Sequence, residues 1–198
     1  MRTRTAVLLT LGILLTACGS PAPTPGPQST EPTSSSSPAT STTAPTSAAP
    51  AIDVDDTLLS HLPAQIDGRD LVADSGTAED LVTDPGLSES VSALAIASAF
   101  GPEDYVVATV VRLRDGVFGD EFYRSWRDTY DKAVCAQAGG VEQVAIETTI
   151  GDRPTFIGTC GGGVHTYHVY LPGPDVLVSM QALGDRRYGE LVVAGLNG

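Results

Sequence analysis

The chain has 198 residues, of which 24 are acidic and 11 are basic, so its formal net charge is −13 at pH 7. So large an acidic excess opposes association with nucleic acid and with an anionic membrane surface, because both attract positive charge. We therefore expect no nucleic-acid partner, and we expect the charge to favour solubility.

The start of the chain combines basic residues, an apolar run and a cysteine. Two arginines lie within the first four residues, and the apolar run over residues 6–16 is too short to span a bilayer but suits a secretory signal. The run ends in Leu15-Thr16-Ala17-Cys18, which resembles the lipobox of bacterial lipoproteins. The resemblance implies a signal peptide over residues 1–17, cleavage before Cys18, and a diacylglycerol anchor on the Cys18 thiol. The alternative is an ordinary secretory signal with an incidental cysteine.

Residues 18–51 join this leader to the remainder of the chain. From residue 20 onward they are almost entirely Pro, Ser, Thr and Ala, and Glu31 is the one charge. Such a segment buries too little apolar surface to offset the entropy of ordering it, so we expect a disordered linker. Its reach is about 100 Å as polyproline, or about 30 Å as a flexible coil. We expect it to hold one domain, residues 52–198, at the extracytoplasmic face of the cell membrane.

The first half of this domain mixes turns with two apolar segments. Residues 55–62 predict a short helix that Asp55 or Asp56 caps and Pro63 ends. Turn residues dominate from 63 to 87, with one helical turn at 77–82. Residues 93–100 are apolar and fit either a helix or a buried strand, and their periodicity leaves both open. Residues 105–113 are rich in β-branched side chains and predict a strand.

A long helix is predicted from residue 121 to about residue 138, with Asp120 as its N-cap. Apolar residues recur at steps of three and four, which predicts that one face packs on the core. That inner face comprises Phe122, Trp126, Tyr130, Ala133 and Val134. The solvent face comprises Arg124, Arg127, Asp128, Asp131 and Lys132.

Four strands follow, at residues 142–150, 154–160, 164–171 and 175–183. The links between them are short and rich in Gly and Pro, which leaves no room for crossover helices and predicts an antiparallel meander. A last helix is expected from Asp185 to about Leu196, with Tyr188, Leu191, Val192 and Leu196 facing inward and with Gly189 weakening it. The fold class is therefore α+β: an antiparallel sheet with the long helix and the C-terminal helix packed on it. This order of elements is loosely similar to that of the Mog1/PsbP-like folds.

The remaining side chains of chemical interest are two cysteines, two histidines and a tryptophan. Cys135 and Cys160 are an even pair in an exported domain, which favours a disulfide. His165 and His168 lie three apart on a predicted strand and so on opposite faces, which disfavours a shared metal site. They and Trp126 are the weak candidates for a ligand site.

No nucleophile motif, phosphate loop or metal-binding motif occurs in the sequence, so we expect no catalytic residue, no metal and no cofactor. The function we expect is that of a cell-envelope lipoprotein with a non-enzymatic binding or accessory domain. Its partner would be an envelope protein, a glycan or a lipid. The alternative is an envelope enzyme of hydrolase type with a site near His165 or His168. Ten arginines against one lysine, Lys132, indicate a GC-rich genome such as that of an actinobacterium.

Overall fold

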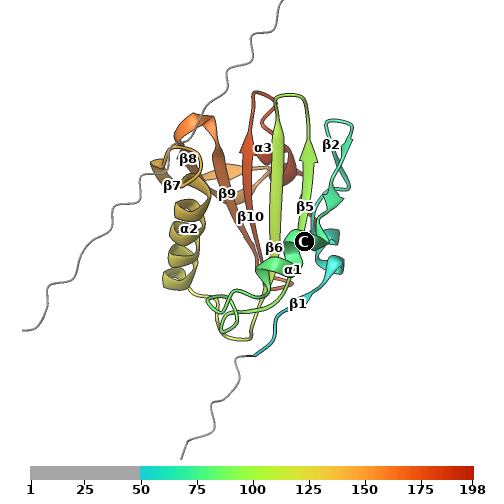
Figure 1. Cartoon of the computed structure of the whole chain (residues 1–198), viewed down its shortest axis with the longest axis vertical. Coiled ribbons are helices and arrows are strands. Elements are labelled where there is room, and N and C mark those ends of the chain that lie inside the picture. Colours follow the sequence, from blue (N-terminus) through green and yellow to red (C-terminus); the bar gives the residue numbers. More distant parts are fainter. Residues whose placement is uncertain (1–49) are drawn as a thin grey trace, which may run out of the picture. The chain divides into compact units, whose positions relative to one another are not determined.

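The computed structural model describes residues 50–198, in which one large sheet carries helices on both faces (Figure 1). The sheet has eight strands in the order β1-β5-β6-β10-β9-β8-β7, with β4 also paired to β5. Its strands are β1 (Asp53–Val54), β4 (Val72–Ala73), β5 (Val91–Phe100), β6 (Tyr105–Leu113), β7 (Val141–Ile150), β8 (Arg153–Cys160), β9 (His165–Leu171) and β10 (Val176–Leu183). A separate hairpin joins β2 (Gln65–Ile66) to β3 (Arg69–Asp70).

The helices are α1 (Ser75–Leu81), α2 (Asp120–Cys135) and α3 (Tyr188–Ala194), with two 3₁₀ helices, η1 (Asp56–His61) and η2 (Gly161–Gly163). The α+β class is confirmed, and so is the antiparallel meander of β7, β8, β9 and β10. The segment whose type was open is the strand β5. Its side chains are buried on both faces of the sheet, so it reads as a continuous apolar run without alternation.

Each face of the sheet has its own apolar core, and neighbouring residues of one strand divide between the two. On β10, Val176 and Val178 belong to the core beneath α3 and η1, whereas Leu177 belongs to the core beneath α1 and α2. Because successive side chains of a strand point to opposite faces, α2 and α3 cover opposite sides of the sheet. The strands β5, β6 and β10 are thereby covered on both sides and form the rigid centre of the fold.

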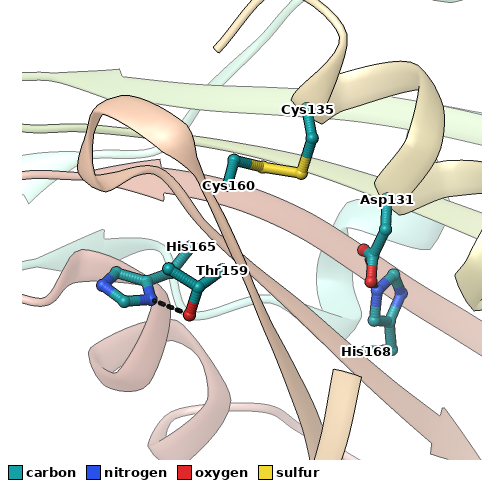
Figure 2. Close-up of a disulfide and its surroundings, with 6 residues drawn as sticks. All are labelled: Asp131, Cys135, Thr159, Cys160, His165 and His168. Carbon is teal, nitrogen blue, oxygen red and sulfur yellow. Dashed lines mark hydrogen bonds and ion pairs between the residues drawn. A yellow bond between two sulfur atoms is a disulfide. The ribbon is translucent and has the colours of Figure 1, made fainter. Parts of the chain in front are cut away.

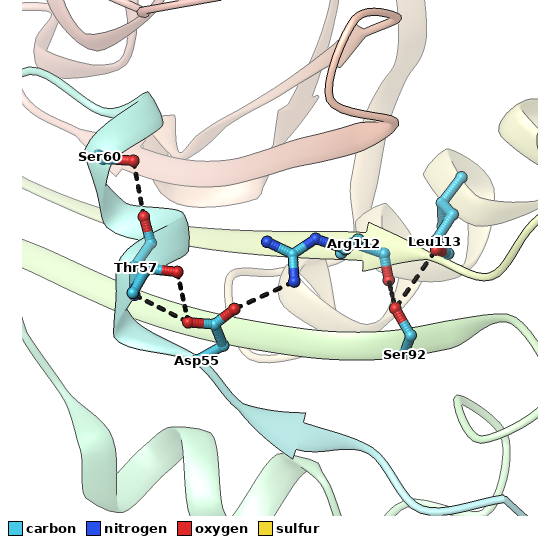
Figure 3. Close-up of polar contacts among 6 residues, drawn as sticks. All are labelled: Asp55, Thr57, Ser60, Ser92, Arg112 and Leu113. Carbon is cyan, nitrogen blue, oxygen red and sulfur yellow. Dashed lines mark hydrogen bonds and ion pairs between the residues drawn. The ribbon is translucent and has the colours of Figure 1, made fainter.

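Asp55 fixes the first residues of the domain against the sheet (Figure 3). Of the two caps that the sequence left open, Asp55 is the one that caps the short helix η1: its carboxylate accepts a hydrogen bond of 3.0 Å from the backbone N–H of Thr57. The other carboxylate oxygen lies 3.1 Å from the Arg112 guanidinium on β6. The hydrogen bonds from Thr57 are the main reason that the pKa of Asp55 lies below its usual value. This carboxylate therefore joins the first helix to the centre of the sheet.

The long helix α2 has a different inner face from the one expected. Its buried residues are Tyr123, Arg127, Asp131 and Cys135, whereas Trp126 is only half-buried and Ala133 is exposed. The predicted solvent face therefore contains two buried charged side chains, and that prediction was wrong by about one residue of helical rotation. The N-cap prediction was also wrong, because Gly119 precedes the helix and Asp120 is its first residue.

The C-terminal helix α3 is shorter than predicted and begins at Tyr188, after Arg187 in a left-handed conformation, so Asp185 does not cap it. Leu191 was expected to face inward, but it is 43% exposed, and Val193 is buried in its place. Gly189 was expected only to weaken this helix. In the structure a Cβ atom at Gly189 would overlap the Tyr167 ring of β9, so the glycine allows the helix to approach the sheet closely.

The predicted signal peptide (residues 1–17), the anchor residue Cys18 and nearly all of the predicted linker lie outside the described residues. Within residues 50–198, no helix has both the length and the apolar character needed to cross a membrane.

Candidate functional site

The predicted disulfide is present and joins the last residue of α2 to the last residue of β8 (Figure 2). The Cα atoms of Cys135 and Cys160 are 5.0 Å apart, and both side chains are fully buried. A helix places residues four apart on one face, so an inward Cys135 turns Asp131, Arg127 and Tyr123 toward the sheet as well. The disulfide therefore determines which chemistry α2 presents to the strands.

Beneath α2, four side chains form one buried hydrogen-bonded chain. The Trp126 indole N–H lies 2.9 Å from Ser179 Oγ, and Ser179 Oγ lies 3.0 Å from His168 Nδ1. The other ring nitrogen, His168 Nε2, lies 2.9 Å from Asp131 Oδ1. Because the indole can only donate, the arrangement that satisfies every member has Ser179 donating to Nδ1 and Nε2–H donating to Asp131. His168 is thus a neutral imidazole in this chain.

Burial explains why His168 stays neutral. Its side chain is fully buried, and this desolvation lowers the pKa of His168 below its usual value, although the hydrogen bond to Asp131 acts in the opposite direction. The Tyr130 ring meets the imidazole edge-on at 5.2 Å and closes the site further. Gly158 on β8 leaves the space that Asp131 needs, because a Cβ atom there would come within 2.7 Å of Asp131 Oδ2.

The two histidines lie on opposite faces of the sheet, as their spacing predicts (Figure 2). His165 contacts Thr159 Oγ1 through Nδ1 at 3.4 Å and lines a groove of about 510 Å³, which Glu190 of α3 and Arg187, the residue before that helix, also line. His168 and Trp126 are brought together through Ser179, and His165 has no part in that chain. Across residues 50–198 there is no cluster of three or more His, Cys, Asp or Glu side chains that could hold a metal ion.

The contacts of Ser179, His168 and Asp131 are those of a nucleophile, its base and the group that orients the base. Two observations oppose a reaction at this place. Ser179 is 1% exposed and already accepts the Trp126 N–H, so a substrate has no path to its oxygen while Trp126 keeps this position. Ser179 also lies within the paired strand β10, whose backbone hydrogen bonds are used by β6 and β9. In this conformation the chain of hydrogen bonds holds α2 on the sheet.

Open grooves run along both flanks of α2. The first, toward β6 and α1, has a volume of about 380 Å³ and is mainly apolar, with Trp126, Phe122, Leu81, Leu87 and Val111 among its walls. We name it the apolar groove.

The second groove lies toward β8 and β9 and has a volume of about 630 Å³. Its aromatic walls are Phe118, Tyr123, Phe156 and Tyr170, and Arg127 lies among them. We name it the aromatic groove. Both volumes fall in the range of small-molecule sites in proteins.

The sequence-based candidates include Trp126 and His168 but miss Tyr123, Arg127, Asp131 and Ser179. One signal could have identified the first three of these. A cysteine that bridges to a strand must face the sheet, and counting back from Cys135 in steps of four gives the other buried positions of α2. No comparable signal in the sequence marks Ser179, because the pairing of β9 with β10 is what places it opposite His168, and the sequence does not specify the register of that pairing.

No family model, curated protein or solved structure gives a significant match to this chain. The similarity to the Mog1/PsbP-like folds therefore stays a prediction from the order of the elements.

Proposed function

We propose that this protein is a lipid-anchored binding protein of the bacterial cell envelope, which takes up a small molecule in a groove beside α2. The observation that carries the proposal is the pair of open grooves on the flanks of α2, in a frame that the Cys135–Cys160 disulfide and the polar chain hold rigid. A preformed hollow with many apolar walls and a few polar groups is the usual form of a ligand site. The lipobox-like residues 15–18 support the anchored location.

Native mass spectrometry of the full-length protein, gently purified from the membranes of its own host, tests this function. We expect a fraction of the molecules to carry a bound small molecule, which organic extraction releases for identification. A homogeneous unliganded mass in several mild detergents would contradict the proposal and direct attention to a protein partner.

The location has a separate test. Cys18→Ser should release the protein into the medium or leave its precursor unprocessed, and unchanged membrane retention would contradict the anchor.

A second candidate function is favoured by the contacts among Ser179, His168 and Asp131. If Trp126 swings away, Ser179 Oγ could attack an ester carbonyl while His168 accepts its proton and returns it to the leaving alcohol. A fluorophosphonate probe tests this hydrolase. Labelling of the wild type that increases in Trp126→Ala and disappears in Ser179→Ala would support it. Absence of labelling in both the wild type and Trp126→Ala would refute it.

A further inference from the structure

The aromatic groove contains a buried positive charge. Arg127 is 8% exposed, and its guanidinium carbon lies 3.5 Å from the centre of the Phe156 ring and 4.4 Å from that of the Tyr123 ring. None of the ion pairs or side-chain hydrogen bonds among residues 50–198 includes Arg127. A buried charge without a counter-ion is costly, and two aromatic faces offset only part of that cost.

The nearby carboxylates do not supply the missing partner. Asp131, one turn further along α2, is engaged with His168. Asp120 and Glu147 line the groove, and neither lies within ion-pair distance of the guanidinium. Arg124 adds a second positive charge at the groove wall. The charges within this groove therefore leave Arg127 available to an anion from outside.

A second unsatisfied donor lies beside the first. The Tyr123 hydroxyl and Arg127 Nε are both buried, and neither has a hydrogen-bond partner among the described residues. Burial raises the pKa of Tyr123 to about 12, so the phenol keeps its proton at neutral pH; the charge of Arg127 and the closeness of its guanidinium to the hydroxyl act in the opposite direction, although the two side chains do not meet in hydrogen-bond geometry. Buried donors in native proteins are nearly always satisfied, and both of these side chains line the groove. An acceptor that could serve both of them is an oxyanion.

Aromatic rings and prolines supply the apolar part of the groove wall. The Phe118 and Tyr170 rings stack with their centres 3.5 Å apart, and Phe156 meets the Tyr123 ring at an angle of 87°. Pro154 and Pro172 complete the walls. Such surfaces pack best against another flat, weakly polar group, such as a ring.

We propose that the aromatic groove binds a small organic acid, in which a carboxylate or phosphate group is joined to a ring-bearing body. The oxyanion pairs with Arg127, whose planar fork of N–H donors matches the geometry of both kinds of oxyanion, and the ring lies against the aromatic walls. This inference deepens the proposed function and rests on it, because it specifies which groove is used and the chemical class of the ligand.

Four probes test the assignment by NMR titration of the full-length protein: benzoate, its neutral analogue benzamide, phenyl phosphate and inorganic phosphate. We expect benzoate and phenyl phosphate to shift resonances of Tyr123, Phe156 and Tyr170, and to bind at least tenfold more tightly than benzamide. Inorganic phosphate, which has no ring, should bind at least tenfold more weakly than phenyl phosphate. The relative affinities of benzoate and phenyl phosphate identify which oxyanion is preferred.

Matched variants then assign the effect to one guanidinium. Arg127→Met keeps a long apolar side chain and should abolish the preference for benzoate over benzamide. Arg186→Met removes an exposed arginine that does not line this groove and should leave that preference within about twofold of the wild-type value.

If neither benzoate nor phenyl phosphate binds the wild type more tightly than benzamide does, or if none of the three binds, the inference is overturned without the use of a variant. A neutral ligand recovered from the host protein would overturn this inference while leaving the proposed function intact. A host protein without any ligand would contradict the proposed function itself.

Discussion

Asp131 is the residue whose loss should reveal most about how α2 is held. Asp131→Ala leaves the His168 Nε2–H without an acceptor in a site that is fully buried. Leaving a buried donor unsatisfied costs about 1–3 kcal/mol, and the lost hydrogen bond is of the stronger, charge-assisted kind. We therefore expect a decrease of about 3 kcal/mol in the free energy of unfolding.

Urea denaturation at pH 7, followed by Trp126 fluorescence, measures this decrease. With an m-value of about 2 kcal/mol/M, the midpoint should fall by about 1.5 M. Asp131→Asn retains a carbonyl oxygen that can accept from His168, so it should lose less than half as much. Asp128→Ala removes an exposed carboxylate from the same helix and should change stability by less than about 0.5 kcal/mol.

Equal effects of Asp131→Ala and Asp128→Ala would refute the reasoning, because they would mean that the buried chain of hydrogen bonds contributes nothing to stability. A double-mutant cycle adds an independent check. If Asp131 and His168 act as a pair, the double substitution to Ala should cost at least 1 kcal/mol less than the sum of the single ones. Additive losses would contradict the pairing.

Three further predictions concern glycine packing, pH and the disulfide. Gly189→Ala should destabilise the domain by about 2 kcal/mol, because the added methyl group overlaps the Tyr167 ring. Gly76→Ala in α1, where the nearest atom to the added methyl group is 3.8 Å away, should be neutral or stabilising. Equal denaturation midpoints for the two variants would contradict this. Because the folded-state pKa of His168 is lowered, stability should be complete above about pH 6.5 and decrease on acidification below it, by at most about 1.4 kcal/mol per pH unit. His168→Gln should reduce this slope in pH-dependent melting, and an unchanged slope would count against a neutral buried imidazole. Reduction of the disulfide should lower stability by about 3.5 kcal/mol for a loop of 25 residues, and coincident denaturation curves with and without reductant would contradict that estimate.

The fold class and the meander could both be predicted from the sequence, because short segments of the chain are enough to indicate them. Gly- and Pro-rich links separate β-branched runs, and such short links permit only antiparallel neighbours. The position of β5 and β6 beside β10 was beyond prediction, since nothing local specifies which strands pair across the α2 segment. The type of β5 was ambiguous for a related reason: a strand covered on both faces lacks the alternation that identifies strands.

The candidate site was predicted less well than the fold, and the reason is specific. Apolar periodicity placed Trp126 and Phe122 inward and Arg127 and Asp131 outward, whereas the disulfide at Cys135 rotates the helix by about one residue, which buries Arg127 and Asp131 and leaves Trp126 half-buried. Periodicity assumes that apolar residues are the buried ones, and this assumption fails where a helix buries charged groups against polar partners on a sheet. The misassigned residues are also the ones on which the proposed ligand site and the buried polar chain depend.

The most direct test of the account is to observe the Arg127 guanidinium itself. In ¹⁵N-labelled protein its side-chain N–H resonances can be assigned by their loss in Arg127→Met and then followed during titration with benzoate. The account predicts that these resonances shift downfield as the oxyanion binds, and that benzamide at the same concentration leaves them in place. Resonances that do not move with benzoate, or that move equally with benzamide, would contradict it.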